Sequence, residues 1–72
     1  MPLGPRENEV LDQEAQRLYR LAQLNPDVRL CFIMARHNLQ LLMNVCLSTG
    51  MTGVEASNIL YWKLKALTGR DD

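Results

Sequence analysis

Aromatic residues are scarce in this sequence: they make up 6% of its 72 residues, whereas hydrophobic residues as a group make up 47%. The core is therefore expected to be aliphatic, built from Leu, Ile, Val, Met and Ala side chains. That apolar share also excludes a chain that is disordered throughout. A chain of this length buries only about 60% of the surface that its unfolded form exposes, so it holds one small domain and no second one.

An excess of either charge is also missing. Eight Lys and Arg residues balance eight Asp and Glu residues, for a formal net charge of +0. A neutral chain has little non-specific attraction for nucleic acid or for an anionic membrane. Any partner must therefore be recognised by a local surface.

Disulfides and targeting segments are not expected. Cys31 and Cys46 lie on what is predicted to be one continuous helix, roughly 22 Å apart at about 1.5 Å per residue, so they cannot bond to each other. Residues 1–5 have neither a basic region nor an apolar run, and the long apolar stretch at residues 28–47 is interrupted by six polar side chains. The sequence thus predicts a reduced, cytoplasmic protein without a membrane span.

Groups that could converge on a reaction are few, because the chain has one His and two Cys. Cys31 and His37 would lie about 240° apart around a helix axis, so they cannot form a nucleophile and base pair. No glycine loop fits a phosphate, and no Cys, His or carboxylate cluster has the spacing of metal ligands. The sequence predicts a protein that is not an enzyme and that needs no cofactor or metal.

Three helices are predicted, without strands, so the fold class is all-α. The first begins near Asn8 and carries an apolar stripe of Leu11, Ala15, Leu18 and Ala22. Asn25 and Pro26 end it, and Asn25 is the expected N-cap of the next helix. Residues 1–7 are expected to be a flexible leader, residues 8–68 a single helical domain and residues 69–72 a flexible tail.

The second helix is expected to run from Pro26 to about Ser48 and to be apolar over most of its circumference. Gly50 supplies its stop. The third helix begins at the capping box of Thr52 and Glu55 and ends before Gly69.

A homodimer is predicted from the long central helix, because two short amphipathic helices cannot cover an apolar arc of about 240°. A heteromeric partner that covers the same arc is the alternative. Asn38 lies near the middle of this arc. It either makes a hydrogen bond within the monomer or with a water, or faces its symmetry mate and sets the register. The predicted dimer interface consists of Met34, Asn38, Leu41, Leu42 and Val45.

A partner-binding surface is predicted on the third helix. Trp62 lies about 160° from the core residue Leu60, so it should be partly exposed, and large amphipathic rings contribute strongly to interfaces. The alternative is that Trp62 packs under the leader or the dimer mate. The predicted partner-binding residues are Asn58, Tyr61, Trp62 and Lys65.

The second and third helices also form a helix-turn-helix pattern around Gly50. The presumed recognition helix has no Arg or Lys before Lys63, whereas reading bases usually needs Arg, Asn or Gln supported by cations on phosphates. DNA is therefore the second choice of partner.

One stretch resembles a known family. The residues that carry the resemblance are Asp27, Val28, Leu30, Phe32, Ile33 and Met34, followed by Gly50, Met51, Ala56 and Leu60. Over residues 27–60 the chain resembles the small FlhD-type subunit of the flagellar transcriptional activator, although the charged middle of that family is replaced here by Leu41, Leu42, Met43 and Val45. The resemblance implies a dimeric, all-helical transcription regulator that works through partner proteins.

Three functions remain open. The first is a small homodimeric, non-enzymatic regulator that binds a protein partner in transcriptional control and changes its activity by occupying a surface. The second is a DNA-binding helix-turn-helix regulator. The third is a helical export chaperone or assembly adaptor whose apolar groove holds a partner helix.

Overall fold

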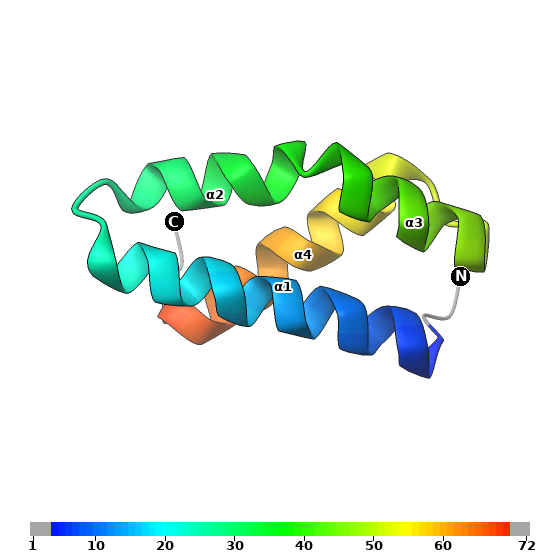
Figure 1. The fold of residues 1–72 in the computed structure, drawn as a ribbon, viewed down its shortest axis with the longest axis horizontal. Helices are drawn as coiled ribbons and strands as arrows, with labels where there is room; N and C mark the ends of the chain where they lie inside the picture. Colours follow the sequence, from blue (N-terminus) through cyan, green and yellow to red (C-terminus); the bar gives the residue numbers. More distant parts are fainter. Residues whose placement is uncertain (1–3, 70–72) are drawn as a thin grey trace.

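The computed structural model describes residues 4–69, and all of the secondary structure in that range is helical. Helices α1 (Pro5–Leu24), α2 (Val28–His37), α3 (Leu39–Thr49) and α4 (Gly53–Thr68) follow one another along the chain. Figure 1 shows α1 running one way, α2 and α3 together running back beside it, and α4 reversing again. Helices α1 and α4 each pack against all three other helices, and the α1–α4 pair makes the most extensive contact.

Helix α1 begins earlier than the sequence predicts. Pro5 is its first residue, and the Asn8 amide donates to the Gly4 carbonyl oxygen at 2.9 Å. Proline suits the first helical position, because its missing N–H would have no partner there. Residues 5–7 of the expected leader are thus helical, while residues 1–3 of the leader and residues 70–72 of the expected tail lie outside the described residues.

The predicted cap of the second helix is wrong. Asn25 ends α1 instead, with its amide bonded to the Leu21 carbonyl oxygen at 2.9 Å, and Asp27 occupies the N-cap position of α2. Pro26 forces Asn25 out of the helical region to φ −108° and ψ 126°. The Asn25 side-chain oxygen accepts a hydrogen bond from the Asp27 amide at 2.9 Å, which closes a turn between the helices.

The central helix is not continuous, and this is the main difference from the sequence prediction. Asn38 has φ −79° and ψ 74°, outside the helical region, and it separates α2 from α3. The two helices meet at an angle of 42°. The Asn38 side-chain oxygen accepts a hydrogen bond from the Leu41 amide at 3.5 Å, so Asn38 caps α3. A short amide side chain offers the backbone this alternative to a helical turn.

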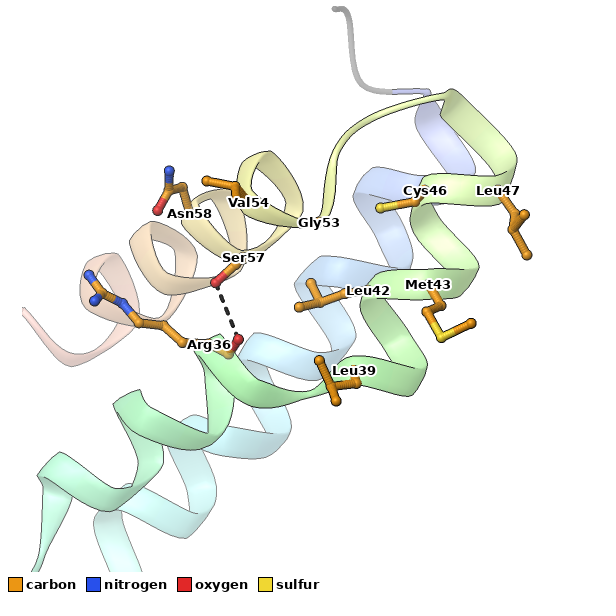
Figure 2. Close-up of a pocket in the computed structure, with 10 residues that line it drawn as sticks. All are labelled: Arg36, Leu39, Leu42, Met43, Cys46, Leu47, Gly53, Val54, Ser57 and Asn58. Carbon is orange, nitrogen blue, oxygen red and sulfur yellow. Dashed lines mark hydrogen bonds between the residues drawn. The ribbon is translucent and has the colours of Figure 1, made fainter.

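The break leaves the last carbonyl groups of α2 without helical partners. The His37 ring Nδ1 lies 2.9 Å from the Ile33 carbonyl oxygen, one turn before these groups, and the Ser57 hydroxyl on α4 donates to one of them, the Arg36 carbonyl oxygen, at 3.4 Å. Figure 2 shows the second of these bonds crossing from α4 to the end of α2. The break is therefore supported both locally and by α4.

The end of α3 and both ends of α4 follow the sequence prediction. Gly50 adopts the left-handed conformation at φ 72° and closes α3, and Gly69 does the same for α4 at φ 71°. Glycine is favoured there because a side chain would clash in this conformation. The Thr52 hydroxyl oxygen accepts a hydrogen bond from the Glu55 amide at 3.1 Å, which is one of the two hydrogen bonds of the predicted capping box.

The core is aliphatic, as the scarcity of aromatics indicates. The predicted stripe of α1 is buried in full and meets buried residues from every other helix. The buried apolar residues are Leu11, Ala15, Leu18, Ala22, Cys31, Ala35, Leu42, Val45, Met51, Ala56, Leu60 and Leu64. Cys31 and Cys46 are both free thiols.

A polar link between α1 and α4 was not predicted. The Lys63 ammonium donates to the side-chain oxygens of Asn8 and Asp12, each at 2.7 Å. Asp12 and Lys63 also form an ion pair. This link joins residues more than 50 positions apart in the chain, so helical periodicity alone gives no sign of it.

Among the described residues, no single helix is both long and apolar enough to cross a membrane. Helices α2 and α3 taken together meet the requirement for length and composition, with a 42° bend between them.

Candidate protein-binding surface

The predicted dimer interface is not one continuous surface. Leu42 and Val45 are only 5% and 2% exposed, because they face α1 and α4 within the monomer core. Leu41 is partly buried against the same core, and Asn38 is half-buried as the cap of α3. Of the five predicted residues, Met34 alone is exposed. The Asn38 side-chain oxygen accepts its hydrogen bond from the Leu41 amide of the same chain. This agrees with the hypothesis of a hydrogen bond within the monomer.

An open apolar groove lies between α3 and α4, with a volume of about 710 Å³. Its lining residues are Arg36, Leu39, Leu42, Met43, Cys46, Leu47, Gly53, Val54, Ser57 and Asn58. Figure 2 shows Leu42 and Cys46 pointing from α3 toward α4, with Met43 and Leu47 along the outer side of α3. Leu47 is 83% exposed and Val54 on the opposite wall is 71% exposed. The groove therefore presents large apolar side chains to solvent.

Two small residues line the groove at the start of α4. Gly53 has no side chain, and a Cβ atom added there would meet nothing within 4 Å. Ser57 follows one turn later and directs its hydroxyl to the Arg36 carbonyl oxygen. The α4 wall of the groove is therefore low at these two positions.

The groove carries almost no charge. Helix α3 has no charged residue, and Arg36 is the one charged side chain among the lining residues. An exposed apolar surface of this kind is typical of a protein interaction site. The sequence did not predict that Leu39, Met43, Leu47 and Val54 line one groove. The three α3 residues and Val54 of α4 come together only through the break at Asn38 and the turn at Gly50.

The predicted partner-binding residues of α4 lie at different depths. Trp62 is 63% exposed, as its angle from Leu60 predicts, and Asn58 is exposed at the groove wall. Tyr61 is half-buried. Lys65 differs from the expectation of an accessible contact, because its side chain is only 7% exposed. Its aliphatic stem is buried while its ammonium lies 5.0 Å from the Tyr61 ring centre and 5.1 Å from that of Trp62.

Aromatic rings from two helices form a row beside the groove. Phe32 on α2 meets the Tyr61 ring edge-on with ring centres 5.4 Å apart, and Tyr61 meets Trp62 at 6.1 Å. The Arg36 guanidinium lies 4.3 Å from the centre of the Tyr61 ring. Such contacts between a cation and a ring face are attractive. Phe32 and Arg36 were not predicted to join this surface, since no sequence pattern relates the end of α2 to the middle of α4.

The residues with reactive side chains are held apart. Cys31 is buried in the core, whereas His37 is exposed with its ring on the Ile33 carbonyl oxygen. Within residues 4–69, no group of three His, Cys, Asp or Glu side chains is arranged to hold a metal ion.

Comparison with known proteins identifies no relative. No family model matches the chain, and no curated protein and no solved structure matches it. The two surfaces described above, the groove and the aromatic row beside it, are therefore the basis for assigning a function.

Proposed function

We propose that this chain is a small, non-enzymatic helical regulator that forms a homodimer, binds a protein partner in transcriptional control, and changes that partner's activity by covering part of its surface. The observation that carries the proposal is the open apolar groove of about 710 Å³ between α3 and α4. Apolar surface left exposed in this way is stabilised when a second protein covers it. The assignment to transcriptional control is supported by the resemblance over residues 27–60.

The outer side of α3 is suited to pairing with itself. Leu39, Met43 and Leu47 are spaced four residues apart, so they form one stripe along the helix. In an antiparallel pair with its two-fold axis at Met43, each Leu39 lies opposite Leu47 of the second copy. Helix α3 has no charged residue, so the pair meets no like-charge repulsion. A two-fold dimer requires a surface that is complementary to itself. An antiparallel pair meets this requirement by placing the apolar side chains of one stripe against those of the other.

Sedimentation of the wild type and of Met43→Glu tests the dimer. The wild type should be a dimer at micromolar concentration, and Met43→Glu should be a monomer of unchanged helicity, because a carboxylate would be buried without a partner in the dimer. Gln40→Glu is the matched control, since it places the same charge on an exposed position of α3 that is not part of the groove. A wild type that stays monomeric and binds no dye for exposed hydrophobic surface would overturn this part of the proposal.

The partner is assigned to the face of α4 that carries Trp62. A photo-reactive amino acid at position 62 should cross-link one partner in the host cell, and Trp62→Ala should abolish its capture while leaving helicity and dimerisation intact. Leu24→Ala is the control, because Leu24 is also largely exposed but lies at the end of α1. Equal capture by Trp62→Ala and the wild type would overturn the assignment.

The DNA-binding alternative has weaker support. The first turns of α4 carry Glu55 but no cation, and the ammonium of Lys63 is already bonded to Asn8 and Asp12. Few cations are left to contact phosphates, which supply most of the affinity for DNA. Nanomolar binding of a specific duplex at physiological salt would favour this alternative over a protein partner.

The groove also favours a second candidate, the export chaperone or assembly adaptor. An amphipathic helix of a client could lie between α3 and α4, where Val54 and Leu47 would contact its apolar face. The two candidate functions predict different behaviour of the isolated protein. A chaperone-like subunit should aggregate without its client, whereas a self-paired dimer should remain dispersed.

A further inference from the structure

Five residues of α2 and α4 make up what we call the cation–aromatic face: Phe32, Arg36, Tyr61, Trp62 and Lys65. The Arg36 guanidinium and the Lys65 ammonium both lie near the Tyr61 ring, at 4.3 Å and 5.0 Å from its centre. Trp62 extends the row outward and is the most exposed of its rings. Two positive charges are thus held beside exposed apolar surface.

Neither cation has a carboxylate partner within residues 4–69. The ion pairs in this part of the chain are Arg17 with Glu14 and Lys63 with Asp12. Between residues 28 and 69 the sequence has four Lys and Arg residues but a single acid, Glu55. Four acids lie instead in the first half of α1. Because Lys63 is paired with Asp12, the cations Arg29, Arg36 and Lys65 remain against one acid, so residues 28–69 carry a local excess of positive charge.

Lys65 is the least exposed of the charged side chains on this face. Its side chain is more than nine-tenths buried, and no hydrogen bond from its ammonium to another described residue is present. The ammonium nonetheless keeps contact with solvent, because no polar side-chain atom without a partner is fully buried among the described residues. The Tyr61 and Trp62 rings lie on one side of it, so an incoming carboxylate can reach it from the solvent side.

We propose that the cation–aromatic face binds an acidic segment of the partner protein, an amphipathic helix with carboxylates along one flank. Its carboxylates pair with Arg36 and Lys65, and its apolar side chains pack on Trp62 and on the groove wall at Val54. The inference rests on the proposed function, for which it specifies the chemistry of the partner. An acidic helix fits better than a polyanion, because two cations set among apolar side chains match a few carboxylates rather than a continuous row of phosphates.

Two synthetic helical peptides test the inference. They share the same leucine positions and lack tryptophan, and one has Glu where the other has Lys along the flank. Trp62 is the only tryptophan of the chain, so its fluorescence reports binding directly. The Glu peptide should bind at least about tenfold more tightly than the Lys peptide, and the preference should weaken as salt is raised.

Single substitutions test which side chains produce the preference for the Glu peptide. Arg36→Gln should reduce the Glu-over-Lys preference several-fold, and Lys65→Met, which keeps a stem of similar length, should do the same. Arg20→Gln is the matched control, because it removes one exposed positive charge from α1 and should leave the preference unchanged. If Lys65→Met fails to fold, Arg36→Gln carries the test alone, since Arg36 is exposed.

The inference is overturned if the two peptides bind equally, if Arg36→Gln and Arg20→Gln behave alike, or if a DNA duplex or a vesicle of anionic lipid binds more tightly than the Glu peptide. These outcomes are distinct from failure of the proposed function. A partner captured through Trp62 whose binding ignores Arg36 would keep the proposed function and reject the acidic helix. Loss of both the dimer and the captured partner would reject the proposed function itself.

Discussion

Asn38 shows how one side chain changes the central helix. Its amide oxygen caps α3, and its backbone lies outside the helical region. Its neighbours at helical spacing, Met34, Leu41, Leu42 and Val45, are all apolar, which is why the sequence favours an interaction between copies. In the structure its hydrogen bond lies within the monomer, so we expect its replacement to change the stability of the monomer.

Replacing Asn38 by Leu should therefore destabilise the protein. Loss of the cap is expected to cost about 1 kcal/mol in the free energy of unfolding, measured by urea denaturation monitored by circular dichroism. Asn38→Asp should keep the cap and be neutral or slightly stabilising, because a negative charge suits a helix N-terminus. If Asn38→Leu instead raises stability while loosening the dimer, the amide sets register between copies.

Lys63 supports a second prediction at this scale. Its ammonium is held by Asn8 and Asp12 from α1, and replacing it with Met should cost about 1 kcal/mol, since hydrogen bonds to charged groups exceed exposed ion pairs in strength. A double-mutant cycle with Asp12→Ala measures the coupling directly. Additive losses in that cycle would show that the link contributes nothing beyond the two separate side chains.

At the level of the helices, the sequence predicts a helix end correctly where residues within one or two turns determine that end. Gly50, Thr52 and Gly69 end or begin helices by their own conformation or by a hydroxyl acting three residues away. The apolar stripe of α1 also follows from spacing alone. These features were predicted correctly because each depends on neighbours within one or two turns.

The break at Asn38 could not be predicted in the same way. Apolar residues continue at helical spacing on both sides of it, so periodicity favours one long helix. The support for the break includes Ser57, which is 21 residues away. The groove was missed for the same reason, and so was the contribution of Phe32 and Arg36 to the cation–aromatic face. These contacts depend on the break at Asn38 and the turn at Gly50, which bring α2 and α3 beside α4.

The cap of α4 provides a prediction for a single element. Thr52→Ala should reduce the free energy of unfolding by about 1 kcal/mol, because the Glu55 amide loses its acceptor. Thr52→Ser should retain most of the stability, since the hydroxyl remains. Amide hydrogen exchange should rise first at the start of α4 in Thr52→Ala. Unchanged exchange there, with the same loss of stability, would place the effect of Thr52 elsewhere.

For the whole molecule, the distribution of apolar side chains matters more than their number. A small aliphatic core is enclosed by four short helices, while Leu47, Val54 and Trp62 remain in solvent. A domain of this size has little surface area to bury and correspondingly little margin of stability. Covering the groove with a second copy would add apolar burial that the monomer cannot reach by itself.

The stability of the whole protein should therefore depend on its concentration. If two copies pair through α3, the folded state is stabilised by mass action, and the Tm should rise as the protein concentration is raised from low to high micromolar. Met43→Glu should remove this dependence, because its charge opposes burial of the stripe formed with Leu39 and Leu47, while Gln40→Glu should preserve it. Differential scanning calorimetry over a hundredfold range of concentration measures both. A Tm that is independent of concentration in the wild type, together with a monomeric mass, would show that the groove stays open and would leave a helix from another protein as its occupant.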